Sequence, residues 1–158
     1  MKRVPLILLS LGAMMMPASL LGAEQWEGFG IKHLGFVFDV PPGFVLAQRS
    51  DQGAAFEGKN NAFLAVWGAQ LGKASFRTEI EHRMAVNEND GWKVTYKRVT
   101  PQWASYSGLK DGQILYVRAI KICGDRAALF TVTYARNEKV PYDPLIVRMV
   151  KSLKVQSC

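Results

Sequence analysis

The sequence is poor in the residues that carry most catalytic and metal-binding chemistry. Its 158 residues include only two histidines, His33 and His82, and only two cysteines. Neither histidine lies in a His-Glu-x-x-His or Gly-x-Ser-x-Gly context, and neither has metal-ligand spacing with Asp39 or Asp51. We therefore expect no catalytic residue, no metal site and no cofactor.

The remaining enzyme-like groupings have structural explanations. Ser105 and Ser107 occupy alternate positions of an expected strand, which is typical of side chains that pack and hydrogen-bond across strands. Glu79 and Glu81 are two residues apart on an expected helix, so they point to different sides and do not form an acid and base pair. The fragment 28–30, Gly-Phe-Gly, lacks the third glycine of a phosphate-binding loop. A small hydrolase is therefore the least favoured function.

The chain also has no block of charge of one sign. It carries 20 Lys and Arg against 13 Asp and Glu, a net charge of +7, and apart from Lys2 and Arg3 the bases are spread from Lys32 to Lys154. Nucleic-acid binding regions cluster their bases among exposed aromatic side chains. This even spread indicates a solvated, basic surface and excludes nucleic acid as the expected partner.

A long apolar run occurs only at the N-terminus. Lys2 and Arg3 precede apolar residues 4–16, Pro17 follows, and the segment ends in the small residues Gly22 and Ala23. This order is typical of a signal peptide cleaved after Ala23. We expect residues 1–23 to be removed and residues 24–158 to form a single α+β domain that is periplasmic or secreted.

An uncleaved membrane anchor is the alternative for this segment. Residues 4–21 are apolar over about the length at which a membrane-spanning helix begins to be possible. Pro5, Ser10 and Pro17 interrupt the run, and no stop-transfer charges follow it, although Leu21 is large for its place before the cleavage point. We favour cleavage, which leaves no stable membrane span.

Export makes Cys123 and Cys158 a candidate disulfide. A strand over 126–136 carries the chain about 33 Å from the preceding turn, a helix over 144–153 returns about 15 Å, and the last five residues reach about 16 Å. The two sulfurs can therefore meet. The alternative is a buried free Cys123 and a frayed Cys158 that is available to another chain.

Alternation and turn residues predict the strands. A first run, 35–40, stops at Pro41-Pro42-Gly43, and runs 44–48, 54–57 and 62–67 follow with turn residues between them, as in an antiparallel meander. Runs 92–97, 102–107, 113–123 and 127–136 form the core of the sheet, and Gly124-Asp125 makes a two-residue hairpin. On run 92–97 we expect Trp92, Val94 and Tyr96 to share the buried face.

Two helices complete the predicted fold. The first covers 75–88: Phe76, Ile80 and Met84 recur every four residues, Ser75 caps its start, and Asn89-Asp90-Gly91 ends it. The second begins with Asp143 as its capping residue and Pro144 as its first helical residue, and it buries a stripe through Leu145, Met149 and Leu153. An antiparallel sheet packed with two helices is an α+β fold.

The segment Gly35–Phe44, with the sequence GFVFDVPPGF, resembles the opening of the Mog/PsbP-like α/β sandwich family. The segments 91–97, 103–108 and 112–116 are also similar to small, mostly uncharacterised secreted proteins of alphaproteobacteria. The resemblance covers most of residues 28–153 and concerns strands and turns. It implies a non-enzymatic accessory role, with no shared catalytic residue to carry over.

Aromatic and basic residues on neighbouring predicted strands form a candidate binding surface, and Arg98 and Lys121 are further bases close by in sequence. Its members are Trp92, Lys93, Lys97, Trp103, Tyr106, Lys110, Tyr116 and Arg118. Such a surface suits an anionic ligand or an acidic protein. We expect an exported binding or accessory protein of the bacterial envelope. A secreted inhibitor or immunity protein is the alternative that fits the same size and disulfide.

Overall fold

The computed structural model describes residues 25–158, and the expected signal peptide, 1–23, lies outside the described residues. A seven-stranded antiparallel sheet runs in the order β3-β4-β5-β9-β8-β7-β6, and a three-stranded sheet in the order β1-β2-β10. The large sheet contains β3 (Val45–Arg49), β4 (Gly53–Glu57), β5 (Phe63–Gln70), β6 (Lys93–Val99), β7 (Trp103–Lys110), β8 (Gln113–Ile122) and β9 (Arg126–Ala135). The small sheet contains β1 (Glu27–Ile31), β2 (Phe36–Val40) and β10 (Lys154–Val155), and the helices are α1 (Phe76–Asn89) and α2 (Lys139–Ser152). Short 3-10 turns, η1 (Lys59–Asn61) and η2 (Arg136–Glu138), complete the element order. The predicted α+β class, with an antiparallel sheet and two helices, is confirmed.

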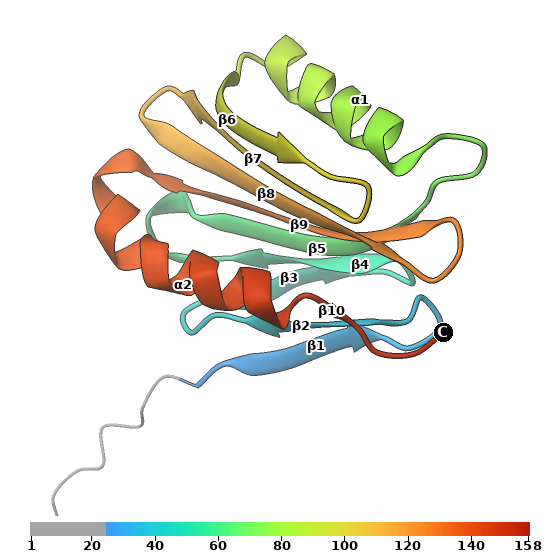
Figure 1. The fold of residues 1–158 in the computed structure, drawn as a ribbon. Coiled ribbons are helices and arrows are strands. Elements are labelled where there is room, and N and C mark those ends of the chain that lie inside the picture. The colour runs from blue at the N-terminus through green and yellow to red at the C-terminus, as the bar shows by residue number, and fades with distance from the viewer. Residues whose placement is uncertain (1–24) are drawn as a thin grey trace, which may run out of the picture.

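The two helices lie on opposite faces of the large sheet. Figure 1 shows α1 above the sheet, and α2 with the small sheet below it. Successive side chains of β9 point to opposite faces of the large sheet. Phe130 and Val132 pack toward α2 and the small sheet, whereas Ala127 and Leu129 pack toward α1. Each layer therefore has its own apolar core, and β9 at the centre of the sheet separates them.

Helix α1 follows the sequence prediction closely. The Ser75 side chain accepts a hydrogen bond from the Thr78 N–H, and Phe76, Ile80 and Met84 are the buried residues of the helix. Gly91, with a φ of 92°, follows the helix end, as a left-handed stop requires. The sequence alone placed both ends because cap, apolar stripe and stop all agree.

Helix α2 corrects the predicted start at Pro144. The helix begins at Lys139, so Pro144 lies inside it, and Asp143 is not a cap but accepts hydrogen bonds from Lys139 Nζ at 2.8 and 3.0 Å. A proline inside a helix removes a backbone hydrogen bond. The additional turn is held instead by tertiary packing, because the Tyr142 ring stacks on the Tyr134 ring of β9 at a centroid distance of 4.2 Å.

Strand β6 contains a bulge that also corrects the prediction. Its register with β7 shifts between Val94 and Tyr96, so Val94 lies opposite Gly108 and Tyr96 lies opposite Ser107. An additional residue in one strand turns the following side chains to the other face. Val94 packs toward α1, whereas Tyr96 lies on the opposite face with half of its surface exposed.

The small sheet was only partly predicted. Strand β2 matches the predicted run at 35–40, but β1 was not predicted, because Gly28 and Gly30 weaken its alternation. β1 and β10 pair with β2 on either side. Through β10 the small sheet holds the end of the chain, and Gln156 N–H donates to the Gly35 carbonyl at 2.8 Å.

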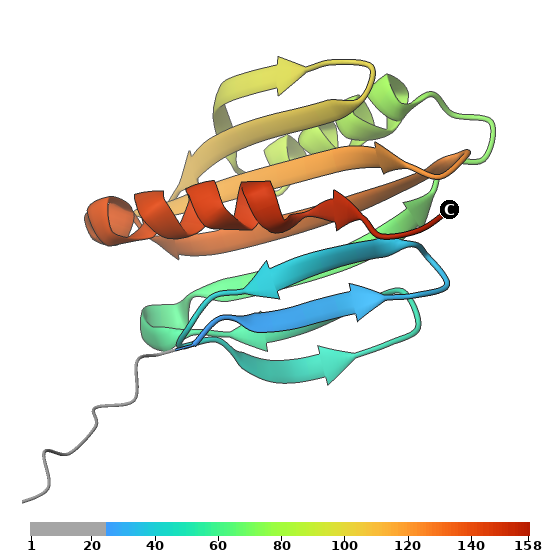
Figure 2. The same ribbon diagram turned by 60° about the horizontal axis from the view of Figure 1, so that its bottom comes forward.

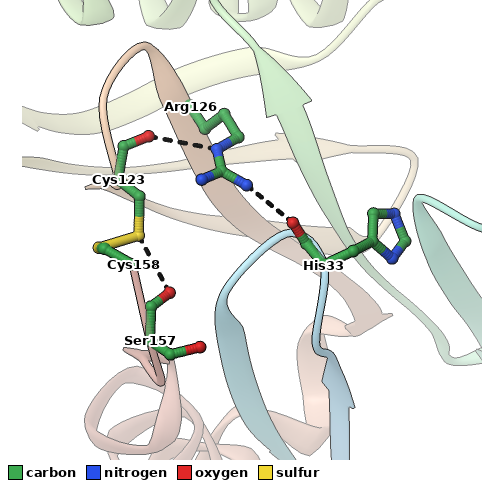
Figure 3. Close-up of a disulfide and its surroundings, with 5 residues drawn as sticks. All are labelled: His33, Cys123, Arg126, Ser157 and Cys158. Carbon is green, nitrogen blue, oxygen red and sulfur yellow. Dashed lines mark hydrogen bonds between the residues drawn. A yellow bond between two sulfur atoms is a disulfide. The ribbon is translucent and has the colours of Figure 1, made fainter.

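The predicted disulfide is confirmed. Cys123 and Cys158 are joined across 35 residues, with Cα atoms 5.3 Å apart. Figure 3 shows the Arg126 guanidinium between the β8–β9 turn and the turn that joins β1 and β2. It donates to the Cys123 carbonyl at 3.2 Å and to the His33 carbonyl at 2.9 Å. The β8–β9 turn is three residues long, not two, because Ile122 pairs with Arg126, and Gly124 takes the left-handed conformation with a φ of 68°. The bond ties the chain end to this hairpin.

Neither helix within residues 25–158 is long and apolar enough to cross a membrane.

Candidate functional site

One half of the sheet is uncovered on the side of α2. Figure 2 shows α2 and the small sheet in front of the other half, while β6 and β7 extend past α2 with no element in front of them. Helix α1 lies behind these strands, on the other face. No second layer therefore covers the side chains of β6 and of the first part of β7 on the α2 side, whereas the apolar side chains of β8 on that side pack against the core under α2.

On the α2 side, β6, β7 and β8 form a surface of aromatic, hydroxyl and guanidinium groups, which we call the cationic face. Cross-strand register places Arg98, Ser105 and Arg118 in one row and Tyr96, Ser107 and Tyr116 in the next. Trp103 lies at the start of β7 on the same side. The face consists of Tyr96, Arg98, Trp103, Ser105, Ser107, Tyr116 and Arg118.

The indole of Trp103 organises the two guanidinium groups. Arg118 lies over the ring at 4.2 Å from its centroid and Arg98 at 5.2 Å. Cations over an indole face are attracted by its quadrupole, and partial desolvation strengthens this attraction. Stacking on one ring therefore holds two positive charges near each other.

The buried Ser105 hydroxyl fixes the neighbouring side chains. Its Oγ accepts a hydrogen bond from Arg118 Nη1 at 3.1 Å and lies 3.1 Å from the Tyr116 hydroxyl, which also donates to it. Ser105 is only 4% exposed. The serine is thus a positioning group, in agreement with the packing and hydrogen-bonding role expected from the sequence.

The charges of this face are not neutralised within the described chain. Four ion pairs join residues in the range 25–158, and none of them includes Arg98, Arg118 or Lys93. Burial lowers the pKa of Arg118 below its usual value, although the nearby Tyr116 and Tyr96 act in the other direction. The Arg118 Nε is also buried without a hydrogen-bond partner. An anion placed here would offset the repulsion between the two guanidinium groups.

The structure divides the eight predicted surface residues between the two faces. Trp103, Tyr116, Arg118 and the edge residue Lys93 lie on the α2 side. The other four lie on the α1 side: Tyr106 is 2% exposed in the α1 core, Trp92 packs against that core, Lys110 lies over Trp92, and Lys97 pairs with Tyr106. The predicted group is therefore not one continuous surface.

Tyr96 lies on the face opposite to the predicted one. A strict alternation places it beside Val94, and only the bulge brings it beside Tyr116 and Arg98. The run Val94-Thr95-Tyr96 contains no glycine or proline that would signal a bulge. No local pattern could have identified this member of the face.

A groove borders the cationic face where α2 meets the sheet. It has a volume of about 470 Å³ and shares Tyr116 and Ser107 with that face. Its walls are mainly apolar side chains of β7, β8 and α2, including Leu109, Ile114 and Ile146. Flat and hollow surfaces thus lie next to each other on this side of the molecule.

A second hollow, of about 350 Å³, lies between α1 and the sheet. Its central cation is already engaged: Arg83 pairs with Glu79 and lies over the Trp67 ring at 5.3 Å. Among the described residues no group of three or more His, Cys, Asp or Glu side chains is arranged to hold a metal ion.

The two helices and the antiparallel sheets form a Mog/PsbP-like α+β fold. The chain is similar to the cyanobacterial PsbP, CyanoP, of Synechocystis sp. PCC 6803, with a TM-score of 0.66 and 11% identity over 89% of this chain and 98% of that one. It is also similar to the Ran-binding protein Mog1p of Saccharomyces cerevisiae, with a TM-score of 0.61 and 11% identity over 85% and 97%. A point mutant of Mog1 gives a TM-score of 0.60 at 12% identity over 84% and 97%. No family model matches the chain, and no curated protein matches it. The structural part of the resemblance drawn from Gly35–Phe44 is confirmed at the level of fold.

Proposed function

We propose that this chain is an exported, non-catalytic binding protein that recognises an acidic segment of a partner protein through the cationic face. The observation that carries the proposal is the pair Arg98 and Arg118, both stacked on Trp103 and both without an ion-pair partner among residues 25–158. Arg and Trp are the side chains most enriched where binding energy concentrates at interfaces.

The position of the face supports recognition of a large partner. It lies on an open half-sheet and ends at the edge strand β6, so an extended or helical segment can approach without displacing an element. Mog1p, one of the structural neighbours, is a Ran-binding protein, which is compatible with a binding role for this fold. Export is supported by the sequence of residues 1–23 and by the Cys123–Cys158 disulfide, since disulfides persist in oxidising compartments.

Isothermal titration with poly-L-glutamate tests the proposal. The double variant Arg98→Gln/Arg118→Gln should bind at least about tenfold more weakly than the parent chain, because hydrogen bonds to charged groups contribute about 1.5–3 kcal/mol. Affinity should also fall with rising salt.

The matched control is Lys121→Gln/Lys151→Gln, which removes the same charge from exposed positions outside the face. Circular dichroism on both variants checks that they fold. Equal loss of affinity in the two double variants would show that binding follows net charge, and the proposed surface would be rejected.

A further inference from the structure

We propose that the groove between α2 and the sheet is a separate binding site for a small organic anion with an apolar body, such as a medium-chain or aromatic carboxylate. The proposal does not depend on the acidic protein segment considered above. It rests on the chemistry of the groove walls and on two polar groups that have no partner among residues 25–158.

The groove has the size and lining of a small-molecule site. Its volume of about 470 Å³ lies within the range of about 300–1,000 Å³ that is usual for ligand pockets. Leu109 and Ile114 form part of the sheet side, and Ile146 and Val147 form the helix side. Val147 is 52% exposed, so an apolar side chain faces solvent at the rim of the groove. A bound apolar group would remove these surfaces from water.

A tyrosine hydroxyl group supplies the first polar contact. Tyr134 lines the groove and is only 3% exposed, yet its hydroxyl makes no hydrogen bond to any described residue. Its ring is held in place by the parallel stack with Tyr142. Burial, with a further contribution from Asp143, raises the pKa of Tyr134 to about 12, so the hydroxyl remains a hydrogen-bond donor at neutral pH. The hydroxyl is therefore a donor that no described residue engages, and an anion in the groove would supply a charged acceptor for it.

A cation at the same groove supplies the second contact. Arg136 lines the groove and takes part in none of the ion pairs formed within residues 25–158. The acidic lining residue, Asp143, is already paired with Lys139 at 2.8 Å. The groove therefore offers one unpaired positive charge and no unpaired negative charge, which favours an anion over a cation.

The two features together specify an amphipathic acid. The carboxylate is expected near Tyr134 and Arg136, and the apolar body along Leu109, Ile114 and Ile146. The matching alcohol would bury the same apolar surface but would offer the hydroxyl and the guanidinium one neutral acceptor oxygen in place of two charged ones, and hydrogen bonds to a charged acceptor are the stronger ones. Discrimination between an acid and the matching alcohol is thus the signature of the site.

The experiment compares octanoate with octan-1-ol, and 2-naphthoate with 2-naphthol, by isothermal titration and by nuclear magnetic resonance shifts of the backbone amides. We expect saturable binding of both acids, with shifts in β7, β8 and α2, and at least about tenfold weaker binding of the neutral partners. Absence of saturable binding of both acids at millimolar concentration would overturn the proposal, as would equal binding of acid and alcohol.

Variants locate the site within the chain. Val147→Glu places a negative charge at the rim and should weaken octanoate about tenfold or more, whereas Val140→Glu introduces the same residue at an 80% exposed position of α2 that does not line the groove and should have no effect. Tyr134→Phe and Arg136→Gln should each reduce the difference between acid and alcohol. Equal effects of the two glutamate variants, or unchanged discrimination in both polar variants, would reject this location. Arg98→Gln/Arg118→Gln separates the two proposals, since it should leave octanoate binding unchanged.

Discussion

The guanidinium of Arg118 lies 4.2 Å from the centre of the Trp103 ring while its Nη1 donates to the buried Ser105 hydroxyl at 3.1 Å. The indole ring packs on the plane of the Arg118 guanidinium and the hydrogen bond holds its Nη1, so the Arg118 side chain has little conformational entropy left to lose on binding. Preorganised contacts of this kind lower the cost of association. The arrangement is one reason to regard the cationic face as a recognition surface rather than a solvated set of bases.

The first prediction concerns the strength of this contact. A double-mutant cycle with Trp103→Leu and Arg118→Met should give a coupling energy of about 0.5–2 kcal/mol, the range from exposed to desolvated cation–π pairs. Urea unfolding of the four proteins measures it. Arg49 over Phe29, at 5.3 Å, provides a comparison pair outside the face. Additive single effects, with a coupling near zero, would mean that the stacking contributes no stability.

Much of the fold could be predicted because local signals and tertiary packing agree. At α1 the cap Ser75, the apolar stripe and the stop at Gly91 point to the same boundaries. At α2 they disagree: Asp143-Pro144 is a strong local start, but the stack of Tyr142 on Tyr134 holds an additional turn before it. That contact joins residues in different elements, and no local pattern records it.

The candidate site was predictable only in part, for a reason that lies in the bulge of β6. The alternation rule identifies which residues share a face only while the register is unbroken. Trp103, Tyr116 and Arg118 lie on unbroken strands, and they come together as alternation requires. Tyr96 follows the bulge and changes face. Tyr106 lies on the predicted strand, but its side chain points into the α1 core. Which face of the strand a helix covers depends on tertiary packing, so the strand pattern alone does not predict it.

The second prediction concerns the disulfide. The Cys123→Ser/Cys158→Ser double variant should lose about 3–4 kcal/mol of unfolding free energy, because the bond closes a loop across 35 residues and restricts the unfolded chain. Urea unfolding of the oxidised parent and the variant gives the difference. Thiol titration of the denatured, unreduced protein should find almost no free thiol, and two thiols per chain would contradict the bond.

The third prediction concerns Gly35, where the end of the chain passes close to the small sheet. Gly35 has a φ of 81°, and a Cβ at this position would lie 2.3 Å from the Ser157 carbonyl oxygen. Gly35→Ala should therefore cost more than the strain of its backbone conformation alone. Gly43→Ala is the matched control, since Gly43 has a φ of 83° and open space around it.

Thermal or urea unfolding of both alanine variants separates the two contributions. Gly43→Ala should lose about 1–2 kcal/mol from the left-handed conformation, and Gly35→Ala should lose clearly more because backbone must move. Equal losses would show that the C-terminal segment shifts freely away from Gly35, and that β10 and the disulfide do not hold it there.

The fourth prediction concerns stability at high pH. Burial raises the pKa of Tyr106 to about 12, against the weaker opposing effect of Arg83, whereas an unfolded tyrosine titrates near 10. The unfolded chain therefore loses its proton first as pH rises. The stability that Tyr106 contributes by staying neutral is fully present below pH 10 and is lost between about pH 10 and 12.

The variant Tyr106→Phe removes this dependence because phenylalanine has no proton to lose. At pH 8 the two proteins should have similar unfolding free energies, since the Tyr106 hydroxyl has no hydrogen-bond partner among residues 25–158, and at pH 11 the variant should be more stable than the parent by about 1 kcal/mol. Urea unfolding at the two pH values measures the change, and Tyr96→Phe, at a half-exposed position, controls for the loss of a tyrosine. If the parent and the Tyr106→Phe variant lose stability in parallel up to pH 11, this hydroxyl has the same pKa in the folded and unfolded chains and the prediction is wrong. We expect different pKa values because Tyr106 is only 2% exposed in the α1 core.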